Sequence, residues 1–85
     1  MTPKALLRRF TTGALNNVAF RDMCRLVEAF GFDLSRVSGS HHVFAHPDLS
    51  ELLNLQDVKG EAKPYRIRQF LRLVERHDLR LGERE

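Results

Sequence analysis

Three short strand patterns follow one another between residues 32 and 58, with no helical pattern between them. They read "FDLSRVS" (32–38), "HHVFAH" (41–46) and "ELLNLQDV" (51–58). Gly39-Ser40 joins the first two as a two-residue Gly-X turn, which favours a tight hairpin, and Pro47-Asp48 ends the second run. We therefore expect these strands to form an antiparallel sheet.

Helical patterns lie on both sides of these strands. From about Val18 to Phe30 the apolar residues recur on a 3.6-residue period, and Gly31 suits the exit of that helix. Pro64 starts a last helix that fades after His77. The order predicts an α+β fold, a three-stranded antiparallel sheet with helices packed on one face. This α-β-β-β-α core has the order of a double-stranded-RNA-binding-like domain.

The first residues, "MTPKALLRRFTTG", predict an extra short helix, with Thr2 as its cap and Pro3 in its first turn. A chain of 85 residues forms a single domain. We divide it into an N-terminal short helix and linker (1–17), a core domain (18–79) and a C-terminal tail (80–85). The segment "KGEAK" (59–63) is expected to be a polar loop.

Composition limits the class of protein. Hydrophobic residues make up 42% and charged residues 29%, as in an ordinary globular protein, and we see no signal peptide and no membrane span. Cys24 is the single cysteine, which excludes an internal disulfide and predicts a cytoplasmic location. The net charge of +3 comes mostly from arginine, which binds phosphate in a bidentate fashion, so nucleic acid or an acidic protein is the expected partner.

Three of the four histidines, His41, His42 and His46, fall within six positions. Strand alternation places His41 on one face and His42 and His46 on the opposite face. Along the strand, His42 and His46 are roughly 13 Å apart, at ~3.3 Å per residue. No cysteine or carboxylate at a recognisable spacing completes a ligand set, so we predict no metal and no cofactor. A zinc-dependent hydrolase remains a minor alternative. Ser40 beside His41 does not form a nucleophilic triad.

A lone histidine can still catalyse RNA cleavage, because RNA carries its own nucleophile in the 2′-hydroxyl group. One positioned general acid or base contributes roughly 10²–10⁴-fold to the rate. The competing interpretation is a histidine that is only packed or solvated in its strand.

Three segments carry a family resemblance: "VEAFGF" (27–32), "RVSGSHHVFAHP" (36–47) and "KGEAKPYRIRQFLRLVERHDL" (59–79). In this order they resemble the HicA family of toxins from bacterial toxin–antitoxin pairs. The resemblance implies a small messenger-RNA interferase with a double-stranded-RNA-binding-like fold, a metal-independent endoribonuclease acting without the ribosome. It also implies a HicB-type antitoxin that masks the active site. The family's catalytic histidine follows a Gly-Gly or Gly-Ser pair, which corresponds here to His41.

Cations near the histidine are the expected RNA contacts: Arg36, Lys59, Lys63 and Arg66, with Gly39 and Ser40 in the turn. Arg68, Arg72 and Arg76 form a stripe on the last helix that fits a solvated face equally well. Tyr65 is expected to anchor the preceding loop against the core rather than to stack on a base. The alternative to an RNA-cleaving toxin is a non-catalytic RNA- or protein-binding module of the same fold.

Overall fold

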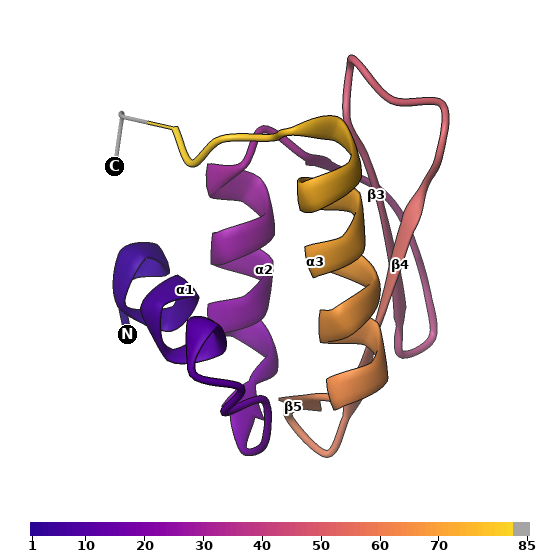
Figure 1. The fold of residues 1–85 in the computed structure, drawn as a ribbon. Helices are drawn as coiled ribbons and strands as arrows, with labels where there is room; N and C mark the ends of the chain where they lie inside the picture. Colours follow the sequence, from indigo (N-terminus) through magenta and orange to yellow (C-terminus); the bar gives the residue numbers. More distant parts are fainter. Residues whose placement is uncertain (83–85) are drawn as a thin grey trace.

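The computed structural model describes residues 1–82 and has an α+β architecture (Figure 1). Its sheet is antiparallel, with the strand order β1-β5-β4-β3-β2. The elements in chain order are α1 (Pro3–Thr11), β1 (Val18–Ala19), α2 (Phe20–Ala29), β2 (Asp33–Ser38), β3 (His41–Ala45), β4 (Leu53–Val58), β5 (Glu61–Ala62) and α3 (Pro64–His77). This arrangement confirms the predicted α-β-β-β-α core and the extra N-terminal helix.

Two short strands differ from the prediction. Val18–Ala19, expected to begin the second helix, is β1, and it pairs with β5 inside the segment expected to be a loop. The turn before β5 explains the pairing. Lys59 and Gly60 both have positive φ (54° and 83°), as a tight two-residue hairpin requires, and Asp57 Oδ1 accepts a hydrogen bond from the Gly60 N–H at 2.7 Å. The chain therefore folds back and extends the sheet from three strands to five.

Helix α1 begins as the sequence predicted. Thr2 Oγ1 accepts a hydrogen bond from the Ala5 N–H at 3.1 Å, and Pro3 occupies the first helical position. Leu6 and Phe10 are buried from its apolar side. In Figure 1, α1 lies beside α2 on the side away from α3. The extension is thus part of the folded core.

The core lies between the helices and one face of the sheet, as predicted. Phe44 on β3 and Leu53 and Leu55 on β4 point to the helices and are almost completely buried. Phe70 of α3 makes edge-to-face contacts with Phe30 and Phe32, at 5.3 and 6.0 Å between ring centroids. Burying each such side chain contributes about 1.5–3 kcal/mol, so this aromatic cluster is a main source of stability.

We call the opposite face of the sheet the open face. Side chains alternate between the two faces along a strand, and directly paired residues of neighbouring strands share a face. Five neighbouring residues therefore lie on the open face: Arg36, His41, Val43, Asn54 and Gln56. In Figure 1 the helices lie to one side of β3 and β4, which leaves this face uncovered. The open face is polar at the end nearest the β2–β3 turn.

Strand β2 forms one edge of the sheet, and all six of its residues are exposed. Its pairing with β3 shifts by one position between Leu34 and Arg36, so that Ser35 is inserted as a bulge. Leu34 and Val37 are about half exposed although they lie on the helix side of the sheet. The helices therefore do not extend over this edge.

The antiparallel order brings two turns to one end of the molecule, which we call the turn end. The β2–β3 turn and the β4–β5 turn both lie there, because His41 pairs with Gln56 three positions before Lys59. Helices α2 and α3 also begin there, and the Phe20 N–H donates to the Gly60 carbonyl at 2.8 Å. Among residues 1–82, no helix combines the length and the apolarity that a membrane span needs.

Candidate active site

The β2–β3 turn presents His41 at the head of β3. Gly39 has a φ of +61°, in the region that favours glycine, and Ser38 pairs with His41 across the two-residue turn. Gln56 Nε2 donates to Ser40 Oγ at 3.3 Å, and the Asp57 N–H donates to the Ser40 carbonyl at 2.9 Å. The turn is therefore held from β4 as well as by its own geometry.

The imidazole of His41 is half-buried on the open face. Its Nδ1 lies 3.3 Å from Oδ1 of Asn54, a side chain on β4. Within residues 1–82, this is the one side-chain hydrogen bond that His41 makes. Asn54 was not among the residues predicted from the sequence, because nothing in the sequence gives the register between β3 and β4.

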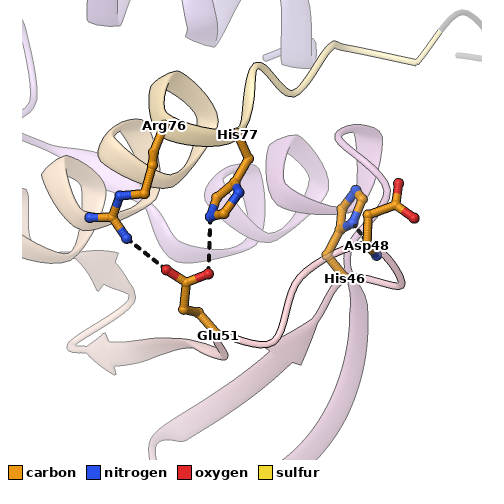
Figure 2. Close-up of polar contacts among 5 residues, drawn as sticks. All are labelled: His46, Asp48, Glu51, Arg76 and His77. Carbon is orange, nitrogen blue, oxygen red and sulfur yellow. Dashed lines mark hydrogen bonds and ion pairs between the residues drawn. The ribbon is translucent and has the colours of Figure 1, made fainter.

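His42 and His46 point to the opposite face, as strand alternation predicted. The His42 ring packs edge-on against Phe20 at 4.8 Å, and the His46 ring packs against Phe32 at 5.1 Å. Nδ1 of His46 also accepts a hydrogen bond from the Asp48 N–H at 3.1 Å (Figure 2). Both rings are thus part of the packing between sheet and helices. In the described residues, no three histidine, cysteine, aspartate or glutamate side chains gather closely enough to hold a metal ion.

The predicted RNA-binding cations fall into two groups. Arg36 shares the open face with His41, and Lys59 lies in the β4–β5 turn at the turn end. Lys63 is the N-cap of α3 and Arg66 lies in its first turn, on the helix side of the sheet. All four are therefore near the turn end, but the sheet separates Lys63 and Arg66 from the ring of His41.

Arg66 is held against α3 rather than extended toward His41. Its guanidinium lies 4.9 Å from the centroid of the Tyr65 ring, and its Nη1 donates to Gln69 Oε1 at 3.3 Å. Its Nε is buried with no hydrogen-bond partner among the described residues. Tyr65 is 53% exposed, so the prediction that it anchors the loop against the core is wrong. It instead supports Arg66 through a cation–π contact.

The arginine stripe on α3 ends in a cluster that the sequence analysis missed. Arg76 Nη1 donates to Glu51 Oε2 at 2.6 Å, and His77 Nε2 lies 3.0 Å from Glu51 Oε1 (Figure 2). Glu51 belongs to the connection between β3 and β4, 25 positions from Arg76, so sequence spacing could not reveal the pair. The cluster links this connection to the end of α3, whereas Arg68 and Arg72 make no side-chain hydrogen bond or ion pair within residues 1–82.

Burial raises the pKa of the Cys24 thiol to about 11, and the negative charges of Glu28 and Asp57 act in the same direction. The thiol therefore stays protonated near neutral pH. A protonated thiol is a poor nucleophile, so Cys24 has a packing role.

The fold and the site define a small α+β domain whose open face carries one turn-presented histidine. Comparison with protein-family models gives the more specific result. The model described as the HicA toxin of bacterial toxin–antitoxin matches residues 20–75, about two thirds of the chain. The chain belongs to the HicA toxin family. No curated protein and no solved structure matches it.

Family membership confirms the resemblance found in the sequence and places the chain on the toxin side of a toxin–antitoxin pair. An antitoxin is accordingly its implied partner. The matched region contains α2, the β2–β3 turn, His41 and most of α3, while α1 and β1 precede it.

Proposed function

We propose that this chain is the toxin of a type II toxin–antitoxin system and cleaves messenger RNA, with His41 as its general acid or base. The observation that carries the proposal is the position of His41. A Gly-Ser turn places its ring, half-exposed, on the open face at the turn end, while His42 and His46 are used in packing. Cleavage would be independent of metal ions and of the ribosome, and no cofactor would be required.

The chemistry follows from RNA itself. The 2′-oxygen attacks the adjacent phosphorus as it loses its proton, and the bond to the 5′-oxygen breaks as that oxygen gains a proton. His41 either accepts the first proton or supplies the second, because imidazole can do both near neutral pH. One such group accelerates the reaction by roughly 10²–10⁴-fold, which suits a toxin that inactivates messages without rapid turnover.

The substrate backbone would lie across the turn end. Arg36 lies on the open face with His41, and Lys59 lies in the β4–β5 turn, at the same end of the sheet as the turn at Gly39 and Ser40. Lys63 and Arg66 would contact phosphates further along the RNA strand, where the backbone amides at the start of α3 also favour negative charge. Proteins hold A-form RNA mainly through such phosphate and 2′-hydroxyl contacts.

The same surface suits the proposed inhibitor. A HicB-type antitoxin that masks the active site would cover His41 and the turn end, and an acidic surface on it would complement the net charge of +3. We propose that toxin and antitoxin meet in the cytoplasm, where messenger RNA is available.

The test compares His41→Ala with wild type for growth arrest and for cleavage of purified RNA. His77→Ala is a matched control, because it removes a histidine from the opposite end of the molecule. We expect His41→Ala to lose both effects with its circular dichroism spectrum unchanged, and His77→Ala to keep them. Equal cleavage by His41→Ala and wild type would sink the proposal.

The competing function, a non-catalytic binding module, predicts a different pattern. In that case His41→Ala keeps its cellular effect, and reversing the charges of Lys59 and Lys63 abolishes RNA or protein binding. Measuring cleavage and binding on the same variants therefore separates the two functions.

A further inference from the structure

The hydrogen bond between His41 and Asn54 crosses from β3 to β4. Asn54 pairs directly with Val43, and His41 pairs with Gln56, so the two bonded residues are diagonal neighbours on the open face. Diagonal Cα atoms on adjacent strands are roughly 7–8 Å apart, a span that two polar side chains can bridge. Here Nδ1 and Oδ1 approach to 3.3 Å.

The hydrogen bond is partly buried. His41 and Asn54 are both half-buried, and Val43, the direct cross-strand partner of Asn54 on the same face, is only 8% exposed. Gln56, the direct partner of His41, bonds to Ser40 instead. The two amide side chains of β4 thus have different partners: Gln56 holds the turn and Asn54 holds the ring.

We infer that Asn54 is the positioning residue for His41, fixing its imidazole as the Nδ1–H tautomer with Nε2 directed to the RNA. The inference rests on the proposed function of His41. A carbonyl oxygen such as Oδ1 can only accept, so Nδ1 must carry the proton that it donates. In the neutral ring Nε2 then holds the free lone pair and can accept a proton.

The contact also persists through the reaction. When Nε2 has taken a proton, both ring nitrogens are donors, and Nδ1–H still donates to Oδ1. The same contact therefore holds the ring whether His41 accepts the proton of the 2′-hydroxyl group or supplies the proton to the 5′-oxygen. A fixed ring lowers the entropic part of the barrier, because the proton acceptor is already oriented.

The tautomer is measured directly by nitrogen-15 NMR of the histidine rings in the RNA-free protein. We expect His41 in wild type to show the Nδ1–H form at a pH where it is neutral. Asn54→Ala should lose this preference, while Asn16→Ala, an exposed asparagine in the α1–β1 connection, should keep it. An Nε2–H form in wild type would overturn the inference, because it would mean that the Asn54 amide group, not its oxygen, faces the ring.

Kinetics on the same variants supply the second readout. Loss of one neutral hydrogen bond should lower kcat about tenfold in Asn54→Ala, with KM nearly unchanged. Asn54→Asp keeps an acceptor but adds negative charge, so it should retain cleavage while the acidic limb of the pH–rate profile moves to higher pH. Asn16→Ala should match wild type in both parameters.

Failure of this inference is distinguishable from failure of the proposed function. If His41→Ala is inactive but Asn54→Ala keeps both the wild-type tautomer and the wild-type kcat, Asn54 has no positioning role and the toxin mechanism stands. If His41→Ala cleaves RNA normally, the proposed function fails, and the tautomer measurement decides only whether the contact exists.

Discussion

At the scale of single residues, Lys59 has a backbone conformation that lysine rarely adopts, and it lies at a position that suits phosphate binding. Its φ of 54° is in the left-handed region, where an L-residue other than glycine, asparagine or aspartate is uncommon. Its side chain is exposed in the β4–β5 turn at the turn end. Residues in this conformation persist where the surrounding structure fixes them, here in a tight hairpin, and they cluster at functional sites.

Replacing Lys59 by glycine should therefore separate stability from function. We expect Lys59→Gly to raise the free energy of unfolding by about 0.5–1 kcal/mol, because glycine adopts positive φ without a steric penalty. The same change should weaken RNA binding, since one cation is lost. Urea denaturation and fluorescence anisotropy with labelled RNA measure the two effects.

Asn17→Gly is the matched control, because Asn17 also has a positive φ, 58°, but lies before β1 in the α1–β1 connection. It should gain less stability, since asparagine tolerates this conformation, and its RNA affinity should not change. A Lys59→Gly variant that binds RNA as tightly as wild type would remove Lys59 from the proposed interface.

The residues of the site differ in how far the sequence could predict them. The two-residue strand period was enough to separate His41 from His42 and His46, because alternation is a property of any strand. Asn54 and Glu51 were missed for a different reason. Their partners, His41 and Arg76, lie 13 and 25 positions away, and only the register of β4 and the path of the β3–β4 connection bring them together.

At the scale of elements, long patterns were predictable and two-residue strands were not. The three main strands begin and end within two residues of their predicted limits, since alternation and the turn residues mark both ends. Strands β1 and β5 have two residues each, too few to show any period. They form because the tight turn at Lys59-Gly60 returns the chain alongside Val18.

Helix α1 lies outside the segment that matches the family, yet its apolar side chains are part of the core. Leu6 is 1% exposed and Phe10 is 5% exposed. Removing such a side chain leaves a cavity that the surrounding residues fill only partly. The extension should therefore contribute to the stability of the whole domain.

We expect Leu6→Ala to lower the free energy of unfolding by about 2–4 kcal/mol, in a single transition with an unchanged urea dependence. Leu7→Ala, at the neighbouring half-buried position, should cost less. Cleavage by the folded Leu6→Ala protein should equal that of wild type, because α1 is distant in the fold from the open face. A loss below about 1 kcal/mol would show that α1 is only loosely docked.

At the scale of the whole molecule, the fold concentrates functional groups at one end. Two hairpin turns, the starts of α2 and α3, and the cations Arg36, Lys59, Lys63 and Arg66 are all near the turn end. The other end is fastened by Glu51 with Arg76 and His77 (Figure 2). Only part of the positive charge is thus free to contact RNA at the proposed site.

This distribution predicts a limited salt dependence for RNA binding. Each phosphate neutralised on a single strand adds about 0.7 to the slope of log K against log[salt], so four cations give a slope of roughly −3. The measurement uses His41→Ala, so that the RNA stays intact, over a series of salt concentrations. Lys59→Gly in that background should reduce the slope by about 0.7. A slope near zero would contradict a phosphate-dominated interface.

The bulge at Ser35 has a consequence for how copies of this chain meet at high concentration. The outer side of an edge strand offers a row of unpaired backbone N–H and C=O groups to any other strand, and such pairing is a common start of aggregation. In β2 the inserted residue interrupts that row, and the charges of Asp33 and Arg36 flank the interruption. The irregularity therefore protects this exposed edge strand against pairing with other copies while it leaves the His41 turn accessible.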